Sequence, residues 1–189
     1  MAVAAASHGE HGHDSTAINR AGLWLFFGSE AVLFGLLGTS RFYLEGIQAS
    51  ELNQVLGLGI TTILVTSSVT AYIGETAMEH DRRGIFAVFI SLTILLGLLF
   101  GAGVAYEWSI AHFHKEEVFG TLFFAMTGLH ASHVLSGLVL LVLVLIHGLK
   151  GRYNSKSMWP VAAVVMWWHF VDIVWVFYYP TLYLVQGVQ

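Results

Sequence analysis

The sequence contains no cysteine and only two prolines in 189 residues. Without thiols the chain can form no disulfide framework, iron–sulfur cluster, thiolate zinc site or cysteine-containing copper site. Charge is also scarce, because charged residues make up 11% of the chain, against about 25% of an ordinary soluble domain. Eight Lys and Arg against twelve Asp and Glu give a net charge of −4, which argues against nucleic acid as a partner.

Apolar side chains take up most of the composition instead. They account for 56% of the residues, and the mean hydropathy is +0.71. These values exclude an ordinary soluble globular domain. A hydrocarbon layer about 30 Å thick needs about 20 apolar helical residues to cross it, so the chain has room for about five or six crossings and for little else.

Long apolar runs between charged residues predict five membrane-spanning helices. Runs such as 86–100 and 134–146 do not alternate apolar and polar residues as the strands of a membrane β-barrel do. The predicted fold class is therefore all-α, a polytopic membrane protein with five transmembrane helices in one bundle over 20–189. A polar, His-rich N-terminal tail is expected over 1–19, and the spans are expected at about 21–43, 52–78, 84–106, 118–149 and 160–185.

The distribution of the eight cations predicts the orientation, because cytoplasmic loops carry an excess of Lys and Arg. With the N-terminus inside and the C-terminus outside, the outer segments hold Arg41 and Lys115. The inner segments hold the other six cations: Arg20, Arg82, Arg83, Lys150, Arg152 and Lys156. The stretch from Glu107 to Glu117 is then predicted to be an outer loop and, after the tail, the largest exposed polar surface.

Ionisable groups inside the spans are candidate functional residues, because a charge at the bilayer centre costs about 2.5–3.5 kcal/mol. Glu30 lies in the middle of the first span and needs a polar partner, a polar cleft or a proton; alternatively it bonds its own helix backbone. His130 and His133 are three residues apart on the fourth span, which predicts a shared face.

The fifth span carries His169 and Asp172, again three residues apart, which could pair on one face. The alternative is that both lie near the inner interface, where Trp and Tyr are enriched and polar groups are tolerated. Small residues also predict close helix packing, at Gly97 and Gly101 and along the stripe of Gly128, Ser132 and Ser136.

Four stretches resemble subunit III of the haem–copper respiratory oxidases, most closely that of cytochrome c oxidase in its five-helix bacterial form. They are LFFGSEAVLF (25–34), MEHDRRG (78–84), GTLFFAMTGLHASHVLSG (120–137) and WWHFVDIVWVFYYPTLY (167–183). The resemblance extends from about Ile18 to the C-terminus. Many family members begin with two further helices that this sequence does not show.

The resemblance implies a non-catalytic subunit that binds no haem, copper or other metal itself. Haem and copper belong to the partner subunits I and II, with subunit I as the main contact. It further implies phospholipids in a helical cleft, stabilisation of the catalytic subunit, support of proton uptake during oxygen reduction, and a bacterial plasma membrane location.

Several residues match the family motifs individually. Glu30 matches an intramembrane glutamate, and His133 matches a histidine that approaches a lipid headgroup. His130 and Trp168 also fall on motif positions. Where the family often has a phosphate-binding arginine this chain has His147, so that role would pass to Lys150 or Arg152.

Other functions fit parts of the pattern. Subunit III of a quinol oxidase is a close variant. A haem b membrane anchor would need facing histidines at matching depth, for which His147 and His169 are the candidates, and a small transporter would need helix breaks at mid-membrane. In the tail, His8, His11 and His13 could bind a metal transiently, although a solvated tail is the simpler interpretation.

Overall fold

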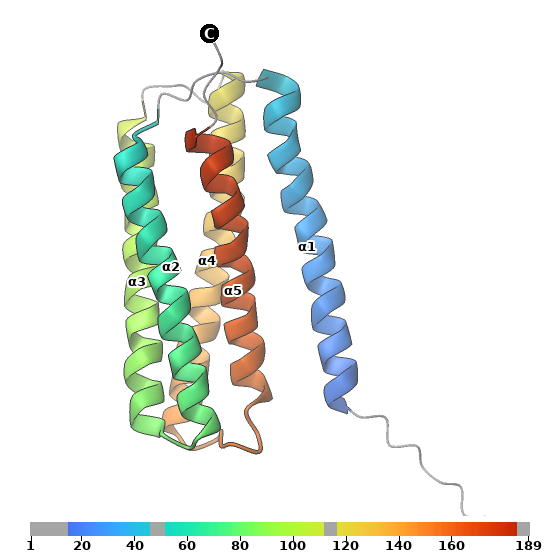
Figure 1. Ribbon diagram of the computed structural model, residues 1–189, viewed down its shortest axis with the longest axis vertical. Coiled ribbons are helices and arrows are strands. Elements are labelled where there is room, and N and C mark those ends of the chain that lie inside the picture. The colour runs from blue at the N-terminus through green and yellow to red at the C-terminus, as the bar shows by residue number, and fades with distance from the viewer. Residues whose placement is uncertain (1–14, 46–51, 112–116, 185–189) are drawn as a thin grey trace, which may run out of the picture.

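The computed structural model describes residues 15–45, 52–111 and 117–184. These residues form five α-helices that run alternately up and down, followed by one π-helical turn (Figure 1). The elements are α1 (Ser15–Glu45), α2 (Gln54–Glu79), α3 (Arg83–Ile110), α4 (Val118–Leu149), α5 (Trp159–Tyr179) and η1 (Pro180–Leu184). Residues 1–14, and with them His8, His11 and His13, lie outside the described part of the chain.

All five α-helices are long and apolar enough to cross a membrane. A backbone in lipid must satisfy its own hydrogen bonds, and an α-helix does so within one segment. The all-α, five-span prediction is confirmed to this extent. Two helices extend beyond the predicted spans, since α1 already begins at Ser15 and α3 continues to Ile110.

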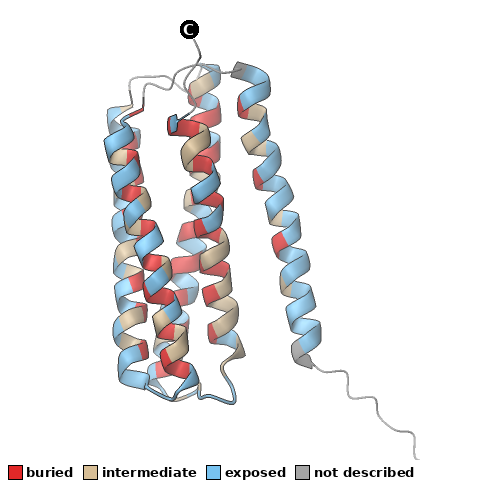
Figure 2. Cartoon of the chain, viewed as in Figure 1, coloured by how far each residue is buried: buried red, intermediate tan, exposed pale blue. Residues whose placement is uncertain are grey.

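Helices α2 to α5 form a four-helix bundle, and α1 lies beside it against α4 and α5 (Figure 1). Burial follows this arrangement (Figure 2): in the most apolar stretch of α1 only 11% of the residues are buried, against 50% in that of α5. Helix α1 is therefore less buried than the helices of the bundle. Its contact surface with α4 and α5, called the seam below, separates α1 from the four-helix bundle.

The bundle core is centred on Trp168, whose ring lies between two helices at glycine positions. A Cβ atom at Gly97 of α3 would lie 2.7 Å from Trp168 Cη2, and one at Gly137 of α4 would lie 2.9 Å from Trp168 Cε3. By contrast, a Cβ atom at Gly101 would meet nothing within 4 Å. Of the two glycines predicted to allow close helix packing, Gly97 does so and Gly101 does not.

The small-residue stripe on α4 does not mediate close helix packing. The nearest neighbour of a Cβ atom at Gly128 would be Trp108, at 3.8 Å. Ser132 and Ser136 are exposed and donate their hydroxyl protons to their own helix backbone. The packing prediction was wrong here, because small residues permit close approach but do not determine which face another helix covers.

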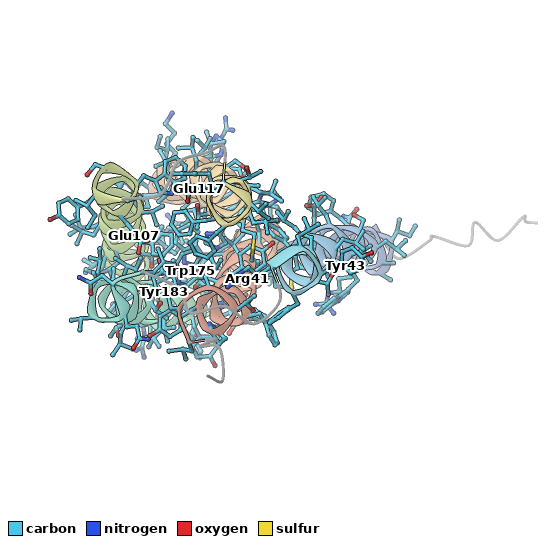
Figure 3. All side chains as sticks on the ribbon, turned by 90° about the horizontal axis from the view of Figure 1, so that it is seen from above. Arg41, Tyr43, Glu107, Glu117, Trp175 and Tyr183 are labelled. Carbon is cyan, nitrogen blue, oxygen red and sulfur yellow. The ribbon has the colours of Figure 1, made fainter. Side chains whose placement is uncertain are left out.

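Two charged residues that the sequence assigns to outer segments are buried instead. Glu107 lies in α3, is 3% exposed, and accepts a hydrogen bond from the Tyr183 hydroxyl of η1. Arg41 lies in α1, is 1% exposed, and stands over the Phe119 ring at 5.2 Å. Figure 3 shows Glu107, Tyr183 and Trp175 among the helices of the bundle. The prediction of an exposed loop from Glu107 onward was wrong at its first residue, because α3 continues past the apolar run; 112–116 are outside the described residues.

Candidate functional site

Glu30 of α1 faces His133 of α4 across the seam between α1 and the bundle. Their side chains meet at 3.0 Å between Oε2 and Nε2, with only 18% and 15% of the respective side chains exposed. His133 Nδ1 also lies 2.9 Å from the Leu129 carbonyl oxygen, which can only accept, so Nδ1 carries a proton. Nε2 and the carboxyl group therefore share one proton between them, either as carboxylic acid and imidazole or as carboxylate and imidazolium.

Aromatic rings surround this pair. The His133 ring stacks on Trp167 at 5.5 Å between centroids and meets the edge of Phe34 at 4.8 Å. Such rings exclude water, and a polar pair without water depends on its own hydrogen bond. The sequence singles out Glu30 and His133 separately, but only the tertiary structure brings them together.

A second polar cluster joins α5 to α2 through Ser68. The Ser68 hydroxyl lies 2.9 Å from His169 Nδ1 and donates to Asp172 Oδ2. His169 and Asp172 therefore share a partner on another helix instead of pairing with each other. Sequence reasoning missed Ser68; the signal was three consecutive hydroxyl residues, Thr66, Ser67 and Ser68, in the middle of an apolar span.

His130 and Trp168 are both fully buried inside the bundle. His130 Nε2 donates to the Val171 carbonyl oxygen at 3.2 Å, and Trp168 Nε1 donates to Ser67 at 2.9 Å. His130 therefore points into the bundle, whereas His133 points to α1. Residues three apart differ by about 60° around a helix, which is enough to reach different neighbours. The shared face that their spacing predicts is not observed.

The remaining candidates lie at the end of α4. His147 Nδ1 is 3.5 Å from the Tyr153 hydroxyl, a weak contact. Lys150 is the C-terminal cap residue of α4, and both Lys150 and Arg152 are exposed. These three residues stand apart from the Glu30–His133 pair and share the end of the molecule at which α1 begins.

An apolar groove runs between α1 and α5, with a cavity of about 410 Å³. Its lining includes Trp24, Phe27 and Ala31 of α1 and Met166, His169 and Phe170 of α5. His169 is the one ionisable group among the residues that line it. Such a lining can hold a hydrocarbon chain, because its surface is almost entirely apolar and aromatic.

In the described part of the chain, the histidines of α4 and α5 contact different partners. His147 contacts Tyr153 and His169 contacts Ser68, so the two candidates for bis-histidine haem ligation have different partners. Among the residues that the structure describes, no group of three or more His, Cys, Asp or Glu side chains could hold a metal ion.

Comparison with known proteins finds similarity to subunit III of terminal oxidases. The family model described as cytochrome c oxidase subunit III matches residues 1–186. A cytochrome c oxidase subunit 3 of Corynebacterium diphtheriae is 40% identical over 82% of this chain and 80% of its own length. One from Thermostichus vulcanus is 28% identical over 93% of this chain and 91% of its own. A probable quinol oxidase subunit 3 of Staphylococcus epidermidis is 31% identical over 89% of each chain.

Proposed function

The chain belongs to the cytochrome c oxidase subunit III family, and from this premise we propose that it is a non-catalytic membrane subunit of an aerobic terminal oxidase. The observation that carries the proposal is the family match over 1–186 together with five helices able to span a membrane. The bacterial relatives support a location in a bacterial plasma membrane. The uneven distribution of Lys and Arg supports an orientation with the N-terminus inside and the C-terminus outside.

The oxygen chemistry then resides in other chains. We propose that subunit I is the main contact and that subunits I and II carry the haem and copper. Three histidines within the described helices are engaged inside the fold, since His133 contacts Glu30, His130 contacts Val171, and His169 contacts Ser68. A subunit that binds only the native assembly raises the stability of that assembly by mass action.

The groove between α1 and α5 supports a role in binding phospholipid. A hydrocarbon chain in this groove would contact Trp24, Phe27 and Phe170, and would thereby bind α1 to the bundle. Proton uptake is supported by the titratable groups at the end where α1 begins. His80 and Asp81 are exposed there, and His147 is half-buried. Exposed groups of this kind can exchange protons with water near the membrane surface.

The oxidase to which this subunit belongs could accept electrons from cytochrome c or from quinol. Cytochrome c is favoured by the relative with 40% identity, whereas relatives at 31% identity are named probable quinol oxidase subunits. The accompanying subunit II decides between them, because a copper-binding cysteine pair in that chain would indicate cytochrome c.

Purification of the native complex tests the proposal. A tag on this chain should bring down haem–copper subunits, and the purified complex should show the absorption bands of haem and consume oxygen. A chain that is purified intact from membranes, but without haem–copper subunits, would overturn the assignment.

A further inference from the structure

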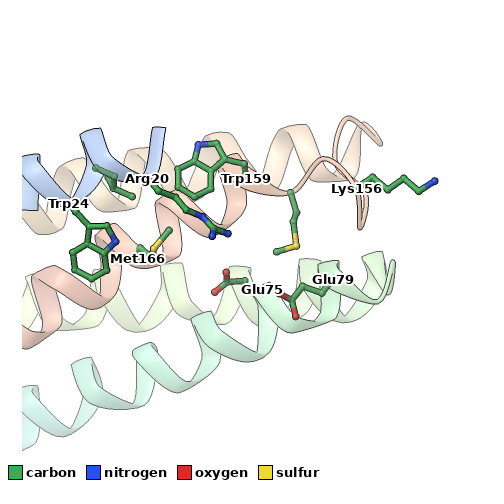
Figure 4. Close-up of a pocket in the computed structure, with 10 residues that line it drawn as sticks. Arg20, Trp24, Glu75, Glu79, Lys156, Trp159 and Met166 are labelled. Carbon is green, nitrogen blue, oxygen red and sulfur yellow. The ribbon is translucent and has the colours of Figure 1, made fainter. Parts of the chain in front are cut away.

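A charged pocket lies where α1 begins, between α1, α2 and the start of α5 (Figure 4). Its volume is about 490 Å³. The charged and aromatic residues that line it are Arg20, Trp24, Glu75, Glu79, Lys156 and Trp159. The candidate site described above uses none of the four charged groups.

The inward-pointing charges are of opposite sign and come from different helices. Arg20 of α1 and Glu75 of α2 point toward one another across the pocket, whereas Lys156 extends away from it (Figure 4). The Arg20 guanidinium stands over the Trp159 ring at 5.7 Å from its centroid. Glu79 follows Glu75 by one helical turn on α2, so the pocket has a cationic wall and an acidic wall.

This pocket continues into the apolar groove between α1 and α5, because Trp24 and Met166 line both. The combined space therefore has a charged end and an apolar extension. The charged end lies at the ends of spans, since the first span begins at Ala17 and α2 ends at Glu79. Tryptophans such as Trp24 and Trp159 are enriched at this depth of a membrane, beside lipid headgroups.

The charges that line the pocket indicate which class of lipid headgroup it can bind. An anionic headgroup would meet repulsion from Glu75 and Glu79, and a purely cationic ligand would meet repulsion from Arg20. A headgroup with a phosphate and a nearby primary ammonium satisfies both walls. Guanidinium binds phosphate in a two-pronged geometry, and an ammonium group has three N–H donors for carboxylates. A choline headgroup has no N–H to donate.

We propose that the space between α1, α2 and α5 selectively binds an amine-bearing zwitterionic phospholipid of the ethanolamine class. Its phosphate lies at Arg20, its ammonium donates to Glu75 and Glu79, and an acyl chain follows the apolar groove past Trp24 and Met166. This selectivity rests on the proposed lipid binding and adds a headgroup preference to it.

Lipid analysis of the purified complex tests the selectivity. The complex is extracted mildly from membranes that contain both phosphatidylethanolamine and phosphatidylglycerol, washed extensively, and analysed by mass spectrometry for moles of each lipid per complex. We expect the ratio of phosphatidylethanolamine to phosphatidylglycerol in the complex to be about fivefold higher than in the membrane, the effect of about 1 kcal/mol of preference.

Two variants and a matched control locate the preference. Glu75→Gln combined with Glu79→Gln should abolish the enrichment and leave the total lipid per complex unchanged. Arg20→Gln should lower the retained phosphatidylethanolamine. Glu117→Gln, which removes an exposed carboxylate at the opposite end of the bundle, should leave the ratio unchanged. If the double variant fails to assemble, Glu79→Gln alone should reduce the enrichment.

The outcomes separate this inference from the broader proposal. Retained lipid with the composition of the membrane, or enriched in phosphatidylglycerol, would overturn the selectivity while leaving lipid binding intact. An intact complex without retained lipid would overturn both.

Discussion

At the scale of single residues, the seam of α1 contains a hydrogen-bonded pair of ionisable side chains. Glu30 supplies a carboxyl group and His133 an imidazole, and the Leu129 carbonyl fixes the proton on the other ring nitrogen. A hydrogen bond between two ionisable side chains within the membrane lowers the cost of burying each of them. This is why an ionisable group can stand in the middle of the first span.

We expect Glu30 and His133 to be energetically coupled. In a double-mutant cycle with Glu30→Ala and His133→Ala, the coupling free energy should be about 0.6–1.7 kcal/mol, which extends from the average to the largest value for hydrogen bonds between membrane helices. The measurement is reversible unfolding of the chain in mixed micelles. Ser29→Ala with His133→Ala is the control, because Ser29 donates to its own helix at Phe26; equal coupling in both cycles would contradict the pairing.

The charge at position 30 should matter more than its size. Glu30→Gln is expected to leave assembly with the oxidase subunits intact, because the amide can donate to His133 Nε2 in place of a carboxylic acid. Glu30→Lys should disrupt assembly or lipid retention, since it places a cation beside an imidazole among aromatic rings. The yield of intact complex after tagged purification measures both, and normal yield for the lysine variant would show that this seam has no role in assembly.

At the scale of helices, packing depends on where a ring enters a neighbouring backbone. Gly97 of α3 and Gly137 of α4 leave room for Trp168 of α5, while Gly101 faces open space. In the GxxxG spacing on α3, Gly97 therefore packs against a neighbouring helix, whereas Gly101 does not.

The two glycines of α3 should respond differently to the same substitution. Gly97→Ala should lower the free energy of unfolding by about 1–3 kcal/mol, because an added methyl group would overlap the Trp168 ring in a filled core. Gly101→Ala should be neutral or slightly stabilising, since alanine favours a helix over glycine. Unfolding of both variants in the same detergent provides the comparison, and similar losses for the two would contradict this packing.

Two connecting segments at one end of the bundle are joined by Asp81. Its carboxylate accepts a hydrogen bond from the Ser155 backbone N–H at 3.0 Å, which lowers the pKa of Asp81 below its ordinary value of 3.8. The backbone of Asp81 is left-handed, with φ of 55°. Asparagine tolerates this conformation, so Asp81→Asn removes the charge without adding strain.

Protection of the Ser155 amide should therefore depend on pH. A carboxylate with a lowered pKa stabilises the folded state above its unfolded pKa, and this contribution is lost as pH falls through the folded pKa. Hydrogen exchange of peptides that contain Ser155 should be slower in the wild type than in Asp81→Asn at pH 7, and the difference should disappear below the lowered pKa of Asp81. A difference that is constant with pH would contradict the assignment.

At the scale of the whole molecule, alternating helix directions separate the cations by end. Six of the eight lie at the end where α1 begins: Arg20, Arg82, Arg83, Lys150, Arg152 and Lys156. Arg41 belongs to the other end but is buried, and Lys115 lies outside the described residues. The end with six cations is the one that the positive-inside rule places in the cytoplasm.

Single cysteines can test this orientation without background labelling, because the chain contains no cysteine of its own. Ser155→Cys and Glu117→Cys introduce thiols at exposed positions on opposite ends. A membrane-impermeant maleimide added to intact spheroplasts should label the position-117 variant, and the position-155 variant should react only after the membrane is permeabilised. The reverse pattern would show that the N-terminus lies outside.

The sequence by itself determined the class of fold and the number of helices. Lipid cannot hydrogen-bond a backbone, so each span must be a self-sufficient helix, and an apolar run of sufficient length shows this locally. Polar residues within the apolar spans also identified Glu30, His133, His169 and Asp172 as candidates, each by itself.

Only the tertiary structure decided which of these groups meet. Helical periodicity places a side chain on a face but does not say which neighbour covers that face, so the Glu30–His133 pair and the bridging role of Ser68 could not be predicted. Burial of Arg41 and Glu107 escaped prediction for a related reason. Glu107 lies where α3 extends past the apolar run, and Arg41 lies near the end of α1. In both places the surrounding elements, not the residue type, determine whether a charge at a helix end meets water.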